Sequence, residues 1–183
     1  MMKNSAPRFR LLALIASIAL LSACSGGGDE SEELVLPVPT VDETAEPEEP
    51  TAEAELERVF RSYWAAIVEM EGESEIPAPS MLDGIATDDV KELEFNRIGN
   101  LKESGHVREG GVDVGEVTVT LEGENEALVQ ACVDSTNWDL FREGEKVELG
   151  NQGIGPSVVR AENASEGWLI AQVRLFDEVT ISC

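Results

Sequence analysis

The hydrophobic residues of this chain change their spacing once, and that change decides the fold class. From Leu56 to Val68 they recur three and four positions apart, which is the spacing of one face of a helix. From Val107 onward they recur at every second position, which is typical of strands with one buried face. Helices followed by a run of strands indicate an α+β fold. We therefore expect N-terminal helices packed on an antiparallel sheet.

Local signals set the limits of two helices. The first is expected to end near Gly72, because Pro77 and Pro79 exclude a long regular helix in the segment that follows. The second is expected to begin after Thr87, which supplies an N-cap, and to end at Gly105. Two helices therefore precede the first strand.

The strand region contains one break in its alternation. Val114 and Val117 have opposite parity, so a β-bulge near Gly115 is needed to keep both on the inner face. Residues 127–133 are apolar on both faces with one exception, as expected of a central strand. We expect the last hairpin to end in a strand over residues 168–179.

The N-terminus has the three parts of a secretory signal. Residues 2–10 are basic, residues 11–21 are apolar, and the string Leu21-Ser22-Ala23-Cys24 follows. This string resembles a bacterial lipobox, in which the cysteine is diacylglycerylated and the cut falls just before it. The 11 apolar residues would span only about 16 Å as a helix, too short for a membrane core of about 30 Å. We expect a lipoprotein signal peptide over residues 1–23 and a lipid anchor at Cys24.

The anchor would hold the protein on the extracytoplasmic face of the cell membrane. The alternative is an ordinary signal peptide with a cysteine near its cleavage site by chance. Residues 24–52 are acidic, rich in proline and glutamate, and free of aromatic residues, which predicts a disordered tether. Its short apolar patch at 34–38 is either a docking strand for a partner or plain linker. The remaining segment, 53–183, has the length of one domain.

The charge balance excludes one class of partner. The chain has 13 Lys and Arg against 37 Asp and Glu, a formal net charge of −24. A basic face for nucleic acid is incompatible with this balance, so no nucleic-acid partner is expected.

Three segments carry a resemblance to a known fold family. They are FRSYWAAIVE at 60–69, ALVQACVDST at 127–136 and EGWLIAQVRL at 166–175. With the order of predicted elements, they make residues 53–183 resemble a nuclear-transport-factor-2-like (SnoaL-like) domain, and small lipoproteins of high-GC Gram-positive bacteria are similar. The resemblance implies a cystatin-like cone, a strongly curved sheet that encloses a pocket with its covering helices. Members of this fold catalyse, bind ligands, dimerise or dock partners.

The cysteines predict one disulfide. If Cys24 is acylated, Cys132 and Cys183 remain as an even pair in an oxidising compartment, and we expect them to be bonded. The alternative is two free thiols. A redox-active pair is disfavoured because the C-x-x-C spacing is missing.

No metal and no cofactor are expected. His106 is the only histidine, which excludes a catalytic triad and a four-ligand zinc set, and calcium-loop spacing is absent. The glycine-rich segment 150–155 lacks the lysine and the following helix of a phosphate loop.

Five residues are candidates for the wall of the implied pocket, although each also fits a core position. They are Tyr63, Trp64, Met81, Asp134 and Trp138. Tyr63 occupies a helix position similar to that of the oxyanion donor in ketosteroid-isomerase-like members. These members also need an Asp base between the helices, and because only Asp83 is near that segment, the base is unplaced.

We therefore expect no catalytic residue and no enzyme activity. The function that we predict is a lipid-anchored, non-catalytic module of the cell envelope that binds an unknown small apolar ligand or serves as an accessory. The alternatives are a protein-docking module of membrane machinery and, less favoured, a SnoaL- or ketosteroid-isomerase-like enzyme. A homodimer formed through the sheet stays open.

Overall fold

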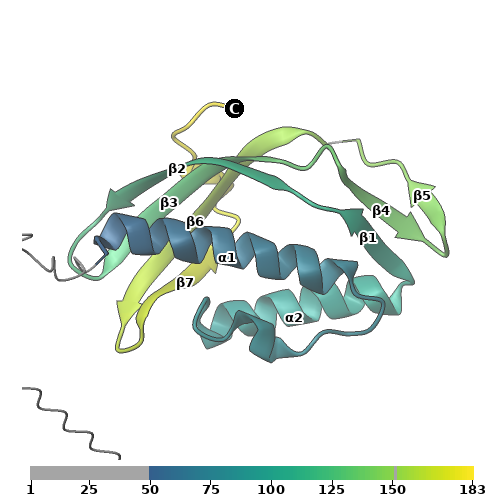
Figure 1. The fold of residues 1–183 in the computed structure, drawn as a ribbon, viewed down its shortest axis with the longest axis horizontal. Coiled ribbons are helices and arrows are strands. Elements are labelled where there is room, and N and C mark those ends of the chain that lie inside the picture. Colours follow the sequence, from purple (N-terminus) through teal and green to yellow (C-terminus); the bar gives the residue numbers. More distant parts are fainter. Residues whose placement is uncertain (1–49, 151) are drawn as a thin grey trace, which may run out of the picture. The chain divides into compact units, whose positions relative to one another are not determined.

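The structure is a computed structural model that describes residues 50–150 and 152–183. The predicted signal peptide, Cys24, the 34–38 patch and most of the tether lie outside the described residues. The described part has two helices on one side of strongly bent antiparallel strands that arch over them (Figure 1). The expected α+β, cone-like fold class is confirmed.

Helix α1 (Ala52–Gly72) ends at the expected residue. Its N-cap is Thr51, whose hydroxyl accepts a hydrogen bond from the Ala54 N–H at 3.3 Å. Its buried side chains follow the helical period and face the sheet. They are Leu56, Val59, Phe60, Tyr63, Ala66, Ile67, Met70 and Glu71.

A short 3₁₀ helix, η1 (Pro79–Leu82), leads to α2 (Asp88–Glu103). Thr87 stands at the N-cap of α2, but its hydroxyl makes no capping bond, contrary to expectation. The Thr87 N–H donates to the Ile170 carbonyl at 3.0 Å, so this residue ties the start of α2 to the sheet. Gly105, with φ of +75°, follows the end of α2 as expected.

In residues 50–150 and 152–183, seven strands form two antiparallel sheets, one in the order β1-β4-β5 and one in the order β2-β3-β6-β7. Their bounds are β1 (His106–Gly110), β2 (Asp113–Leu121), β3 (Glu126–Asp134), β4 (Trp138–Arg142), β5 (Glu145–Val147), β6 (Ile154–Ala164) and β7 (Gly167–Val173). Strand β3 is central, as predicted, and it pairs with β2 and β6.

The sheet bends at two places. The predicted bulge is confirmed between Val114 and Val117, where the register of β2 against β3 shifts. The second bend was not predicted: β1 and β2 belong to different sheets and meet at a corner. There Gly110 has φ of +92°, and a Cβ on it would lie 1.8 Å from the Asn137 carbonyl oxygen. Only glycine fits this close approach of the two chain segments. The corner that they form separates the arm of β1, β4 and β5 from the main sheet.

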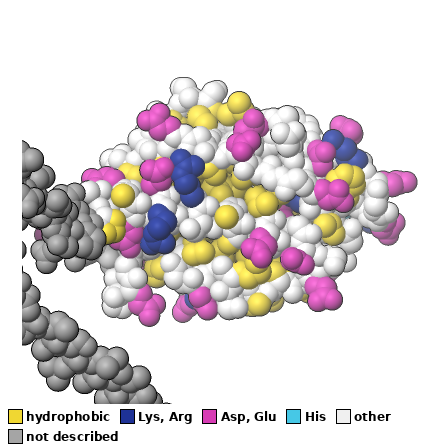
Figure 2. Space-filling model, viewed as in Figure 1, with side chains coloured by type: hydrophobic (Ala, Val, Ile, Leu, Met, Phe, Trp, Pro, Cys, Tyr) yellow, Lys and Arg dark blue, Asp and Glu magenta, His cyan; other side chains and the backbone are white. Residues whose placement is uncertain are grey.

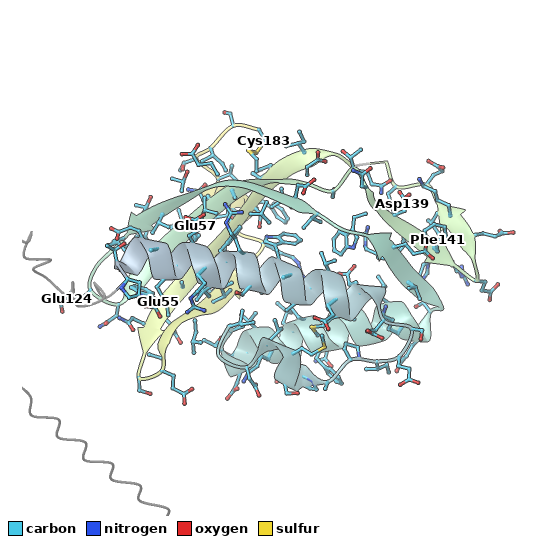
Figure 3. All side chains as sticks on the ribbon, in the orientation of Figure 1. Glu55, Glu57, Glu124, Asp139, Phe141 and Cys183 are labelled. Atoms are coloured by element: carbon cyan, nitrogen blue, oxygen red, sulfur yellow. A yellow bond between two sulfur atoms is a disulfide. The ribbon has the colours of Figure 1, made fainter. Side chains whose placement is uncertain are left out.

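The expected strand over 168–179 is wrong in its second half, because β7 ends at Val173. Arg174 takes the left-handed conformation (φ 62°), which reverses the chain into the 3₁₀ helix η2 (Phe176–Glu178). The final residues then cross the face of the sheet opposite the helices, where Cys183 is bonded to Cys132 (Figure 3). The predicted disulfide is confirmed.

The core lies between the helices and the inner face of the main sheet. Its largest fully buried apolar side chains are Phe60, Leu56, Met70, Leu82, Ile98 and Ile170. On the opposite face Gln130 is 1 % exposed, and its amide exchanges two hydrogen bonds with Thr180, each of 2.8 Å. The chain terminus therefore seals the outer face of β3. Within residues 50–150 and 152–183, no helix combines the length and the apolar character that a membrane crossing requires.

Candidate functional site

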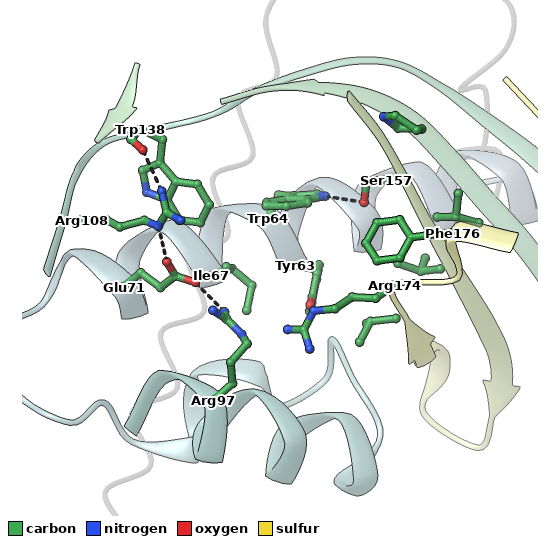
Figure 4. Close-up of a pocket in the computed structure, with 14 residues that line it drawn as sticks. Tyr63, Trp64, Ile67, Glu71, Arg97, Arg108, Trp138, Ser157, Arg174 and Phe176 are labelled. Atoms are coloured by element: carbon green, nitrogen blue, oxygen red, sulfur yellow. Dashed lines mark hydrogen bonds and ion pairs between the residues drawn. The ribbon is translucent and has the colours of Figure 1, made fainter. Parts of the chain in front are cut away.

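A cavity of about 240 Å³ lies where the two helices leave the inner face of β6 and the end of β7 uncovered (Figure 4). Helix α1 supplies one wall, and α2 contributes Arg97. The residues around it are Tyr63, Trp64, Ile67, Glu71, Arg97, Arg108, Trp138, Pro156, Ser157, Val158, Val159, Val173, Arg174 and Phe176. Most of them are apolar, as in many small-molecule sites.

A second hollow of about 310 Å³ adjoins the first and lies at the end of β3 and the start of β6. Six residues line both hollows and therefore stand between the two spaces: Trp64, Arg108, Trp138, Pro156, Ser157 and Phe176. Residues 152–155 and Ser135 close the far side. The second hollow therefore extends the available space beyond the first.

Aromatic rings form the apolar wall. Trp64 meets Trp138 edge to face, with ring centroids 6.2 Å apart, and it meets Tyr63 in the same way at 6.1 Å. The Trp64 indole N–H donates to the Ser157 hydroxyl at 3.3 Å, which orients the ring (Figure 4). A flat apolar ligand would therefore meet rings that are already positioned.

Two buried carboxylates organise the polar wall. Glu71, 1 % exposed, forms ion pairs with Arg97 at 2.5 Å and with Arg108 at 2.8 Å. Arg108 also lies 4.2 Å from the centroid of the Trp138 ring and donates to the Trp138 carbonyl at 2.8 Å. The Lys102 ammonium donates to the Glu71 backbone carbonyl. This end of α1 is thus joined to β1, β4 and α2.

Glu94 is the second carboxylate and is fully buried. It accepts a hydrogen bond from the Tyr63 hydroxyl at 3.0 Å and pairs with Arg97 at 2.6 Å and with Arg174 at 2.5 Å. Arg97 reaches it from one helical turn further along α2, whereas Arg174 reaches it because of the reversed backbone after β7. Arg97 consequently bridges the two carboxylates.

The cluster carries net positive charge. Burial, followed by the charge of Glu94 and the hydrogen bond to it, raises the pKa of Tyr63 far above its ordinary value, so Tyr63 stays neutral. Burial alone would lower the pKa of Arg97, but Glu71 and Glu94 more than compensate and raise it. Three guanidinium groups therefore face two carboxylates. The outer surface contrasts with this, because acidic side chains are spread over the face shown in Figure 2.

The structure places three of the five candidate residues on the cavity wall and two elsewhere. Tyr63, Trp64 and Trp138 line the cavity. Met81, in η1, packs against the core. Asp134, at the end of β3, accepts bonds from the backbone N–H and the hydroxyl of Thr136 at 2.8 and 2.5 Å, which lowers its pKa.

The cluster of charges was missed by sequence reasoning. Glu71 was not among the candidates, yet it follows Ile67 by four positions and continues the apolar face of α1. Glu94 stands in the same way between Val90 and Ile98 on the buried face of α2. The available signal was an acidic residue on the apolar face of a helix. Because a buried charge requires a partner, such a residue predicts a buried ion pair.

Tyr63 and Asp83, the two residues considered for an isomerase, do not meet in one site. Asp83 is exposed and forms an ion pair with Lys91 at 3.0 Å, outside the cavity lining. The Tyr63 hydroxyl is committed to Glu94. Over residues 50–150 and 152–183, no three His, Cys, Asp or Glu side chains are grouped as a metal site would require.

Comparisons with known proteins give distant structural likenesses. No protein-family model matches the chain, and no curated protein matches it either. The intermembrane-space region of the chloroplast protein ARC6 is 16 % identical, with 69 % of this chain and 96 % of that chain covered and a TM-score of 0.44. The Kfla4162 protein from Kribbella flavida is 11 % identical, with 68 % and 90 % covered and a TM-score of 0.44. A protein from Novosphingobium aromaticivorans, provisionally assigned as an aromatic ring hydroxylase, is 11 % identical, with 69 % and 92 % covered and a TM-score of 0.46. At these identities the likeness concerns the general arrangement of helices and strands, and it says nothing of activity or ligand.

Proposed function

We propose that this protein is a lipid-anchored lipoprotein of the cell envelope whose nuclear-transport-factor-2-like domain binds a small apolar ligand without converting it. The observation that carries the proposal is the cavity of about 240 Å³ walled by Trp64, Trp138 and Phe176. An aromatic wall that is held in place by a hydrogen bond and a cation–π contact is a preorganised binding surface.

The pairing of the polar groups supports binding rather than catalysis. A general base needs a carboxylate or imidazole that can reach the substrate proton. The carboxylate on the cavity wall, Glu71, is held by two arginines, and the Tyr63 hydroxyl donates to Glu94. These groups stabilise one another instead of facing a substrate as an acid and base pair.

The location rests on the sequence. The basic, apolar and lipobox parts of residues 1–24 support export followed by acylation of Cys24. Two acyl chains would suffice for stable attachment to the membrane. The acidic tether would then hold the domain away from the negatively charged membrane surface.

The binding proposal can be tested by filling the cavity. Ser157→Phe would place a ring in the space beside Trp64, whereas Glu162→Phe adds the same ring at an exposed position of the same strand. With 2-naphthamide as a neutral aromatic probe and ligand-observed NMR as the readout, we expect Ser157→Phe to weaken binding at least about tenfold. Glu162→Phe should bind as the unmodified protein does.

Native mass spectrometry of the protein from its host provides a second readout. A retained small molecule that is missing from Ser157→Phe would support the proposal. If the unmodified protein neither retains a molecule nor binds the probe, the binding function is wrong. Crosslinking in intact cells would then test the protein-docking alternative.

A further inference from the structure

We infer that the ligand of the cavity is an apolar ring system bearing a single carboxylate, and that Arg174 binds this carboxylate. The inference rests on the proposed binding function and adds the charge and chemical class of the ligand. Its basis is the juxtaposition, on one wall, of aromatic rings and an arginine whose donors are largely unused.

The first argument is the charge of the wall. Arg97, Arg108 and Arg174 line the cavity with one carboxylate, Glu71, while Glu94 lies behind them. Counted with both carboxylates, the three arginines leave one excess positive charge. Basic residues are scarce in this chain, 13 against 37 acidic ones, so three arginines at one cavity are not a consequence of composition. A ligand with one negative charge would neutralise the cluster.

The second argument is the number of donors that remain. Arg97 pairs with Glu71 and Glu94, and Arg108 is held by Glu71 and the Trp138 carbonyl. In the described part of the chain the Arg174 side chain has one partner, Glu94, which contacts one of its terminal nitrogens. A guanidinium has five N–H donors, and the Arg174 side chain is 42 % exposed. Arg174 can therefore donate hydrogen bonds to a second carboxylate while it keeps its ion pair with Glu94.

The third argument is the backbone at Arg174. Its φ of 62° is rare for a residue other than glycine and strains the backbone. This conformation stops β7 and brings the guanidinium beside the Tyr63 hydroxyl, at the side of the cavity that Phe176 also lines (Figure 4). The chain thus maintains a strained residue where it supplies a positive charge to the cavity.

The fourth argument is the match of shape. A carboxylate is planar, and it can take two parallel hydrogen bonds from a guanidinium. Its ring system would then extend toward Trp64 and toward Phe176, which is 68 % exposed although it lines both hollows. A phosphate dianion would instead leave one negative charge uncompensated in an acidic domain. These features favour a ring monocarboxylate.

The test uses two probes that differ in charge but little in shape, 2-naphthoate and 2-naphthamide. Dissociation constants are measured by ligand-observed NMR on the full chain, with all variants in the same detergent so that probe partitioning cancels. We expect the carboxylate to bind roughly tenfold more tightly than the amide, because hydrogen bonds to charged groups are the stronger ones.

Arg174→Gln should bring the ratio of the two constants close to one. Arg142→Gln removes the same charge from an exposed position on β4 and should leave the ratio unchanged. Arg174→Lys keeps the charge and should retain most of the preference. A partly unfolded sample does not change the ratio of the two dissociation constants, because unfolding lowers the apparent affinity for both probes by the same factor.

Each outcome decides a separate point. Equal affinity for the two probes, or an unchanged ratio in Arg174→Gln, overturns the anion inference and leaves the apolar binding function standing. If Arg174→Lys loses as much of the preference for the carboxylate probe as Arg174→Gln does, the role of the positive charge is also contradicted. Failure of both probes to bind overturns the inference together with the proposed function.

Discussion

At the scale of single residues, Glu94 has the largest predicted effect on stability. It is fully buried and is the acceptor for Tyr63, Arg97 and Arg174. Glu94→Gln would leave Arg174 without a neutralising carboxylate and would leave Arg97 with Glu71 alone. Removing one partner of a fully buried ion pair costs about 3–5 kcal/mol, and because the arginines left behind are partly exposed to water we expect about 1–3 kcal/mol here. We expect the free energy of unfolding in urea to fall by that amount.

Glu92→Gln is the matched control for this substitution. Glu92 is exposed on the same helix, so its replacement should change the free energy of unfolding by less than about 0.5 kcal/mol. Equal effects of the two substitutions would contradict the stabilising role of the buried cluster.

Because Tyr63 is buried, the free energy of unfolding should depend on pH in the alkaline range. Its pKa in the folded state is raised from 10.0, with burial as the main cause. Above pH 10 the unfolded chain therefore loses the phenolic proton while the folded protein keeps it. Unfolding becomes more favourable by about 1.4 kcal/mol per pH unit above that value, and the contribution is fully present below it.

Tyr63→Phe isolates this effect. Between pH ~8 and pH ~11, the unmodified protein should lose about 1.4 kcal/mol more unfolding free energy than the variant does. Because Tyr63 is the only tyrosine, ultraviolet absorbance of tyrosinate also reports its ionisation directly. Tyrosinate formation in the folded protein near pH 10 would refute the prediction.

Residue patterns predicted the aromatic part of the site and missed its charged part. Tyr63, Trp64 and Trp138 were found because large aromatic residues at helical or strand spacing face inward. Arg174 was missed because its partner Glu94 is 80 positions away and its backbone conformation leaves no local signature. Local spacing does not reveal which distant charge will compensate a buried one.

At the scale of elements, the C-terminal segment depends on the disulfide. Cys132 and Cys183 are separated by 51 positions, and a crosslink that closes a loop of this size contributes about 2–4 kcal/mol. We expect Cys132→Ser with Cys183→Ser to lower the free energy of unfolding by that amount. Reductant should destabilise the unmodified protein similarly and should leave the double variant unchanged. A response of the double variant to reductant would contradict this explanation.

The elements with local signals were predicted best. Both helices and the bulge after Val114 were expected from periodicity and parity. The separation into two sheets was not, because it depends on how closely Gly110 approaches Asn137 across the pair of strands. Adjacent glycines at 110 and 111 were visible in the sequence, but only the pairing with β4 turns them into a corner.

At the scale of the whole molecule, the main prediction concerns attachment to the membrane. If Cys24 is diacylglycerylated, cells supplied with an alkyne-labelled fatty acid should incorporate the label into this protein. Cys24→Ala should abolish incorporation and release the protein from the membrane fraction. Label that persists in Cys24→Ala would overturn the lipoprotein prediction. The oligomeric state was left open by the sequence, and sedimentation of the same preparations distinguishes a monomer from a homodimer.

The placement of the tryptophans allows intrinsic fluorescence to report on the cavity. Of its three tryptophans, Trp64 and Trp138 line the cavity in edge-to-face contact, while Trp168 is buried in the core. Any occupant of the cavity would change the surroundings of two indoles and leave the third as an internal reference. Intrinsic fluorescence can therefore screen libraries of compounds without a label, and a change at Trp168 would report damage to the fold.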